Sequence, residues 1–200
     1  MRAPDPFHYP DEPHVRRHGP QGYTHYRQYR EWLRDEFRFR CVFCLAREQW
    51  GQVKSLFDID HFQPRVLRPD LVVDYDNLLY ACRTCNSGKS SALVPDLHGC
   101  AYGRCLRVHD DGTIHPLNPE GRILIDELDL DDSQRNVFRK LIITTVQLAA
   151  KHGQQDLLEL YMGLPSNLPA RSEKTASRRQ FAAGGSPHVM ARAAGARRSA

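Results

Sequence analysis

Cys41-Val42-Phe43-Cys44 and Cys82-Arg83-Thr84-Cys85 are two Cys-x-x-Cys knuckles, and the stretch that they enclose decides the fold. It contains Phe57-Asp58-Ile59-Asp60-His61-Phe62 and then Asp76-Asn77, and Asn86 directly follows the last cysteine. Two knuckles can supply four thiolates to one tetrahedral zinc ion. Such an ion has no open coordination position, so we expect it to be structural rather than catalytic. The alternatives are four unrelated buried thiols or a redox pair.

The enclosed stretch predicts two strands followed by a helix. Residues 56–62 alternate as a strand, which Pro64 ends because proline cannot continue a ladder in mid-sheet. Residues 78–81 predict a short buried strand, and residues 86–91 a helix. So small a unit cannot bury enough apolar surface to be stable alone, so zinc binding would supply folding energy. We therefore expect an α+β fold with a small zinc-stapled core, flanking helices and a hairpin.

The order of these motifs resembles the HNH endonuclease family, in the form that carries a four-cysteine zinc. Asp60-His61, Asn77 and Asn86-x-x-Lys89 follow one another in the family's pattern, and the resemblance covers about a quarter of the chain. It implies a ββα-metal fold and metal-dependent hydrolysis of DNA. Many HNH proteins have histidine where this chain has Asn86, so the chain is of the His-Asn-Asn type.

The resemblance also implies a role for each motif residue. His61 would be the general base, Asn77 would orient it, and Asp60 and Asn86 would hold a catalytic divalent ion. Imidazole suits the base because its unperturbed pKa lies near neutral pH. Oxygen ligands favour Mg²⁺ or Mn²⁺ over Zn²⁺ or Ni²⁺. Adjacent strand residues point to opposite faces, so the strand end must bend if Asp60 and His61 act at one place.

Each motif residue also has an ordinary structural interpretation. His61 fits a partly buried histidine with a local hydrogen bond, Asn77 fits a turn, and Asn86 fits a helix cap. Lys89 and Arg65 are close enough in sequence to reach a phosphate, but both equally fit a solvated surface. A non-catalytic zinc module that binds nucleic acid or protein is the alternative for the whole chain, although such a module does not need the four motif residues.

The rest of the chain divides by composition into flanking segments. Aromatic and apolar residues at three- and four-residue steps predict an amphipathic helix before the first knuckle, whose other face is basic: Arg27, Arg30, Arg34 and Arg38. Asp110-Asp111-Gly112 predicts a hairpin turn, and Gly153 a break between two helices. We expect a disordered arm at 1–20, the basic helix at 21–40, the nuclease core at 41–92, a hairpin and helical C-terminal extension at 93–164, and a disordered basic tail at 165–200.

Charge limits how the chain meets its partners. The net charge is +4, but residues 171–200 hold seven basic residues and one acid, so this tail carries +6 and the remainder −2. The body is therefore not a broadly basic nucleic-acid binder, and attraction to phosphates must come from local patches or the tail. HNH nucleases serve restriction, phage defence, packaging and mobile elements. We expect DNA as a partner, and possible targeting by a partner protein.

The sequence contains no apolar run of ~18 residues, so we expect no spanning helix. The N-terminus lacks the apolar core of a secretory signal, which favours the cytoplasm, where thiols stay reduced. Two of the six cysteines lie outside the knuckles. Together with two histidines they offer a weaker hypothesis, a second zinc site on His98, Cys100, Cys105 and His109.

Overall fold

The computed structural model describes residues 3–51, 56–166 and 168. Its strands are β1 (Phe57–His61), β2 (Leu78–Cys82), β3 (Leu106–Val108) and β4 (Ile114–Pro116), and its α-helices are α1 (Arg30–Glu36), α2 (Arg83–Lys89), α3 (Pro119–Leu128), α4 (Ser133–Lys151) and α5 (Gln155–Met162). Short 3-10 helices include η1 (Tyr26–Tyr29), η2 (Glu48–Trp50) and η5 (Tyr75–Asn77). The chain is thus an α+β protein with small antiparallel hairpins.

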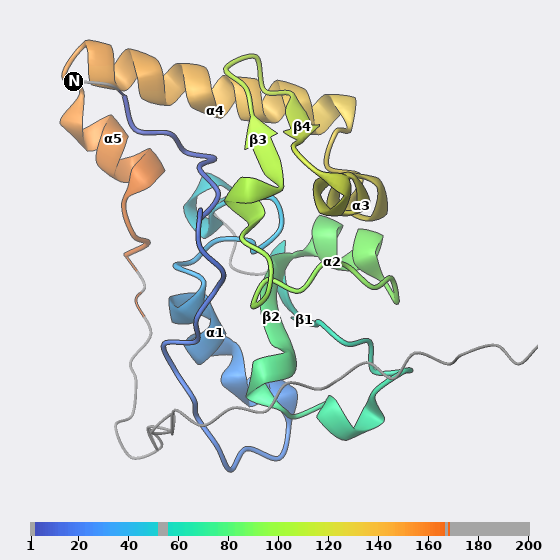
Figure 1. Cartoon of the computed structure of the whole chain (residues 1–200). Helices are drawn as coiled ribbons and strands as arrows, with labels where there is room; N and C mark the ends of the chain where they lie inside the picture. Colours follow the sequence, from blue (N-terminus) through green and yellow to red (C-terminus); the bar gives the residue numbers. More distant parts are fainter. Residues whose placement is uncertain (1–2, 52–55, 167, 169–200) are drawn as a thin grey trace, which may run out of the picture.

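The two expected strands form one antiparallel hairpin, and α2 continues directly from its second strand. In the register of this hairpin Asp60 pairs with Leu79 and His61 with Leu78. The first four residues of β2 are completely buried, because α1 packs against this strand. Figure 1 shows β1 and β2 at the centre, with α1 and α2 on opposite sides. Because α2 folds back along the hairpin, its last residue, Lys89, lies beside the end of β1.

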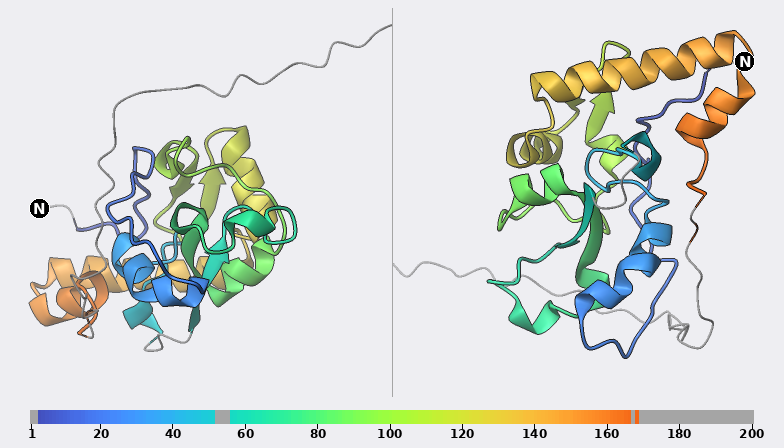
Figure 2. Two further views of the ribbon diagram at one scale, coloured as in Figure 1. Left: turned by 90° about the horizontal axis from the view of Figure 1, so that it is seen from below. Right: turned by 180° about the vertical axis from the view of Figure 1, so that it is seen from behind.

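The C-terminal extension forms a second layer against this core. In Figure 1 and in the rear view of Figure 2, α4 lies across one end of the molecule and α3 lies between α4 and α2. The β3–β4 hairpin turns at Gly112, whose φ of +87° suits glycine. Asp132 caps α4 by accepting hydrogen bonds from two backbone amides. Gly153, with φ +64°, separates α4 from α5, as the sequence predicts.

The helix α3 was not expected from the sequence. Its start carries two standard signals, an N-cap and a proline in the first turn. The side chain of Asn118 accepts a hydrogen bond from the amide of Gly121, and Pro119 occupies the first helical position. These signals were available in the sequence, but the apolar residues that α3 buries are too few to stand out as a periodic pattern.

The N-terminal segment differs from the disordered arm expected at 1–20. Phe7 and Tyr9 are 3% and 4% exposed, and the hydroxyl of Tyr9 donates a hydrogen bond of 2.6 Å to the carbonyl of Phe43. Arg16 lies over two aromatic rings and donates to two backbone carbonyls of the core. The composition of the segment did not indicate this packing, because most of its residues are polar. Two buried aromatic side chains and one stacked guanidinium are enough to hold it.

The basic face expected before the first knuckle is interrupted by Arg34. This side chain is 1% exposed, and its guanidinium makes two hydrogen bonds, of 2.8 and 2.6 Å, to the carboxylate of Glu48. The hydroxyl of Tyr80 donates to the same carboxylate, and Glu31 binds Arg34 from the more exposed side. Arg34 therefore anchors α1 to η2, which follows the first knuckle, and is not available to a nucleic acid.

We expect Glu48→Gln to lower the free energy of unfolding by about 3–5 kcal/mol, because it removes the buried countercharge of the Arg34 guanidinium and leaves only the more exposed Glu31. Glu31→Gln is the matched control, since its side chain is 39% exposed and binds the same guanidinium. It should cost less than about 1 kcal/mol. Urea unfolding of the zinc-loaded proteins measures both values. Equal losses in the two variants would contradict the buried pair.

Two sequence expectations concern the ends of the chain and membranes. The disordered basic tail expected at 165–200 lies, from residue 169 onward, outside the described residues. Within the described ranges, no helix is both long enough and apolar enough to cross a lipid bilayer.

Candidate active site

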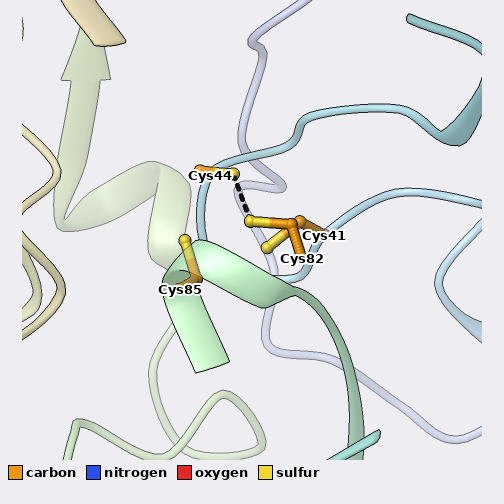
Figure 3. A group of neighbouring side chains, drawn as sticks. All are labelled: Cys41, Cys44, Cys82 and Cys85. Atoms are coloured by element: carbon orange, nitrogen blue, oxygen red, sulfur yellow. Dashed lines mark hydrogen bonds between the residues drawn. The ribbon is translucent and has the colours of Figure 1, made fainter. Parts of the chain in front are cut away.

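The four knuckle cysteines form one cluster at the junction of β2 and α2. Their sulfur atoms all lie within 4.8 Å of one another, and Cys44 Sγ and Cys82 Sγ are 3.6 Å apart. Figure 3 shows the four side chains converging from the two knuckles. In a tetrahedral site with Zn–S bonds of 2.3 Å the sulfurs lie about 3.8 Å apart. The cluster therefore fits a structural zinc ion.

The electrostatics of the cluster also favour a cation. Burial raises the pKa of the Cys41 thiol, and hydrogen bonds with the other three sulfurs raise it further. Without a countercharge, four thiolates would repel one another, and a bound divalent ion removes that cost. On the α4 side, Arg135 Nη1 lies 3.3 Å from Cys85 Sγ. The cluster thus ties the C-terminal layer to the hairpin.

A hollow of about 680 Å³ opens along β1 and extends to the end of this strand. It lies between the turn η1, the strand β1, the loop after this strand and the helix α2. Asp60, His61 and Asn86 all line it, and so do Arg65 and Tyr26. The hollow reaches around the end of the strand, so adjacent residues of β1 border the same space.

Asp60 is buried against a lysine. Its side chain is 5% exposed, and Lys89 Nζ lies 3.3 Å from each carboxylate oxygen. Hydrogen-bond geometry is met only at Oδ1, which leaves Oδ2 buried without a hydrogen-bond partner. Burial raises the pKa of Asp60 to about 6, although Lys89 acts in the opposite direction. A buried carboxylate oxygen without a hydrogen bond, bordering a hollow, fits a cation ligand.

Lys89 does not lie where a phosphate contact would require it. The residue is 1% exposed, and its ammonium group donates to the carbonyl of His61 at 2.8 Å as well as to Asp60. It is therefore an internal countercharge that fixes the end of β1 to α2. The spacing of Lys89 in the sequence places it on this helix but does not tell whether its side chain is buried or solvated.

His61 is oriented by a backbone carbonyl. Its Nε2 lies 3.0 Å from the carbonyl oxygen of Val72, and since a carbonyl only accepts, Nε2 carries the hydrogen. Nδ1 is then the acceptor. Burial lowers the pKa of His61, the hydrogen bond with Val72 acts in the opposite direction, and the positive charges of Arg65 and Lys89 lower the pKa further, so the net shift is downward. The ring is therefore neutral at pH 7, which is the state a general base requires.

Asn77 holds the backbone next to His61, since its carbonyl accepts from the amide of Phe62 at 2.8 Å. Its Oδ1 accepts from the amide of Gln63 at 2.7 Å, and its Nδ2 donates to the carbonyls of Gln63 and Leu71 at 3.1 and 3.3 Å. These bonds hold the loop at Leu71. The residue after Leu71 is Val72, whose carbonyl binds the imidazole of His61. Asn77 is thus related to the imidazole through the backbone, by way of the segment that includes Val72. A carbonyl carries no sequence signal, so Val72 could not have been found beforehand.

The remaining predicted residues lie at the rim. Asn86 is half-buried in α2 and faces the hollow with Asp60 and His61. Arg65 is exposed, and its guanidinium lies 5.9 Å from the ring centre of Tyr26. Arg27 also lines the hollow, from the turn η1. The rim therefore combines an amide ligand candidate with two cations.

Comparison with known proteins gives a distant match to a curated protein. No protein-family model matches the chain. Over 118 residues it is 26% identical to Septu protein PtuB of Bacillus thuringiensis. The chain is a distant homologue of this protein. The alignment covers 53% of the chain and 42% of the Septu protein, so the chain spans less than half the length of this relative.

The second zinc site considered above is not assembled. Among the described residues, the knuckle cysteines are the one group of three or more potential ligands close enough to share an ion. Cys100 and Cys105 do meet, with sulfurs 2.6 Å apart. His98 Nδ1, however, lies 2.8 Å from the carbonyl of His14, and the ring of His109 packs on another histidine.

Proposed function

We propose that this chain is a metal-dependent endonuclease of the HNH type, which hydrolyses phosphodiester bonds of DNA. The observation that carries the proposal is the convergence on one hollow of a buried carboxylate oxygen without a hydrogen bond and a neutral imidazole, from Asp60 and His61, with the amide of Asn86. Hydrolysis of a phosphodiester requires a base for water and a cation for the departing oxygen. These residues supply the base and the ligands for that cation.

His61 is assigned the role of general base. With Nε2–H held by Val72, Nδ1 accepts a proton from water while the water oxygen bonds to phosphorus and the P–O3′ bond breaks. The products are a 5′-phosphate and a 3′-hydroxyl, as in the family that the motif resembles. Lys89 keeps Asp60 in place and neutralises part of its charge before a cation binds.

Asp60 and Asn86 are assigned as the ligands of a divalent ion. Two oxygen ligands that leave room for water favour Mg²⁺ or Mn²⁺. When bound there, the ion would stabilise the negative charge on the leaving oxygen. The four-cysteine zinc would have no part in the chemistry, because its protein ligands fill the tetrahedron.

Arg65 and Arg27 at the rim are assigned to the phosphates that flank the scissile bond. Both lie at the mouth of the hollow, whereas the body of the chain carries a net negative charge. The relation to a Septu protein favours a role in restriction or phage defence, beside a partner protein that supplies targeting. The basic tail would add affinity for DNA that falls with salt and carries no sequence information.

A cleavage assay tests the proposal. Zinc-loaded protein is incubated with supercoiled plasmid, with and without added Mg²⁺ or Mn²⁺, beside Asp60→Asn and Asp58→Asn. Asp58 lies on the same strand and at the same hollow, but it is more exposed and pairs with Arg83. We expect metal-dependent nicking that Asp60→Asn lowers at least about 100-fold and Asp58→Asn leaves within a few-fold. DNA binding without cleavage in wild type would instead support a non-catalytic zinc module.

A further inference from the structure

The ring of Tyr26 lies against the imidazole of His61. The two ring centres are 4.9 Å apart and the planes meet at 71°, an edge-to-face contact. Tyr26 belongs to η1, which precedes the first knuckle and lies outside the motif that resembles the nuclease family. Both rings line the hollow. A segment upstream of the zinc core therefore reaches the base.

One hydrogen bond does not fix the imidazole fully. The contact between Nε2 and the carbonyl of Val72 restrains one ring atom, but the ring plane can still tilt about that point. A change of tilt moves Nδ1 relative to a bound phosphate. A second contact on another side of the ring is needed to hold the plane, and among the aromatic contacts of the described residues Tyr26 supplies it. Edge-to-face pairs of this kind contribute about 0.5–1.5 kcal/mol.

The turn that carries Tyr26 is itself held in place. His25 and Gln28 form a capping box: the His25 ring accepts from the turn, and the Gln28 side chain accepts from the His25 amide at 3.0 Å. The His25 ring also stacks on Tyr26, with centres 4.8 Å apart. Arg30 then donates a hydrogen bond of 2.6 Å to the carbonyl of Phe57. Since Phe57 begins the strand that His61 ends, the turn and the base share one rigid support.

We propose that Tyr26 is a positioning residue for His61, holding the imidazole so that Nδ1 faces the attacking water. The inference rests on the proposed function for its consequence, because positioning matters only if His61 acts as a base. Its geometry does not depend on that function. The phenol oxygen is not the acting group, so phenylalanine at this position keeps the contact and leucine removes it.

The contact between the rings of Tyr26 and His61 is tested by NMR on the full zinc-loaded chain. The Tyr26 ring current shifts the ring-proton resonances of His61, and the spectrum of His61→Ala identifies those resonances among the ten histidines of the chain. We expect Tyr26→Leu to move them and Tyr26→Phe to leave them nearly in place. Tyr23→Leu is the matched control, because Tyr23 packs on Tyr29 and Trp32, away from the hollow. Unmoved His61 resonances in Tyr26→Leu would overturn the inference.

The effect of this contact on catalysis is tested by steady-state kinetics of DNA cleavage. We expect Tyr26→Leu to lower kcat about tenfold or more with little change in KM, because a misplaced base slows the chemical step but not substrate binding. Tyr26→Phe should restore kcat. Full kcat in Tyr26→Leu would overturn the positioning role. If wild type cleaves no DNA while Tyr26→Leu moves the His61 resonances, the proposed function fails and the contact between the rings stands.

Discussion

Replacement of Cys85 by serine is expected to abolish zinc binding and to unfold the core around β1, β2 and α2. Structural zinc sites contribute about 10–16 kcal/mol to folding, whereas a whole domain is stable by only about 5–15 kcal/mol. Loss of the ion therefore exceeds the stability that the small hairpin and helix can supply. Cys85 is completely buried, so a serine hydroxyl there would also lack solvent.

Metal analysis and thermal unfolding measure this effect. Wild type should hold one zinc per chain, and Cys85→Ser or exhaustive chelation should remove both the metal and the cooperative transition. Substituted Co²⁺ should give the absorption bands of a tetrahedral thiolate site, which report the ligand geometry directly. Cys100→Ser is the matched control, because Cys100 lies outside the cluster. It should keep the zinc and shift the midpoint only slightly.

A Cys85→Ser protein with one zinc and an unchanged midpoint would contradict the four-cysteine assignment. A chelated wild type that unfolds at the same temperature as the zinc-loaded protein would contradict the energetic argument, even if zinc binds. The two results separate the identity of the site from its contribution to stability.

The elements that the sequence predicted correctly depend on local signals. The β1–β2 hairpin follows from alternation and from Pro64, and the break between α4 and α5 follows from Gly153. The cysteine cluster follows from knuckle spacing, because each Cys-x-x-Cys stretch places two sulfurs near one point whatever surrounds it. In each case a few adjacent residues determine the local geometry.

The features that the sequence did not predict depend on distant partners. Arg34 resembles any solvated arginine until the loop after the first knuckle brings Glu48 against it. Phe7 and Tyr9 lie in a polar segment, and their burial depends on surfaces formed by residues far along the chain. At the site, the partner of His61 is the carbonyl of Val72, and every residue has a carbonyl. The charge, composition and motif spacing of the sequence do not indicate such pairings.

Substitution of His61 by alanine is expected to lower the cleavage rate about 10²–10⁴-fold, the range that a general base contributes. The fold should persist, because His61 ends β1 and its side chain borders the hollow rather than the core beneath β2. Plasmid cleavage with Mg²⁺ or Mn²⁺ measures the rate, and thermal unfolding with zinc analysis verifies the fold. Cleavage by His61→Ala at the wild-type rate would remove His61 from the mechanism.

The dependence on pH follows from the environment of His61. Burial and the charges of Arg65 and Lys89 lower its pKa below the usual 6.5, so the neutral base persists on mild acidification. The wild-type rate should therefore begin to fall at a lower pH than it would with an unperturbed imidazole, as the ring gains a proton. Asp60 titrates nearby, with a pKa of about 6 in the metal-free protein, and saturating divalent ion displaces its proton. Profiles recorded at saturating metal thus report His61.

Chemical rescue separates the base from other effects of the substitution. The hollow of about 680 Å³ admits a free imidazole in the space that alanine leaves. Added imidazole should restore part of the His61→Ala rate, with a pH dependence set by the pKa of free imidazole rather than of the buried side chain. Asp60→Asn should gain nothing from imidazole, because it loses the negative charge of a metal ligand and keeps its base. Rescue of both variants alike, or of neither, would leave His61 without the role of proton acceptor, since only a missing base is replaced by a diffusible one.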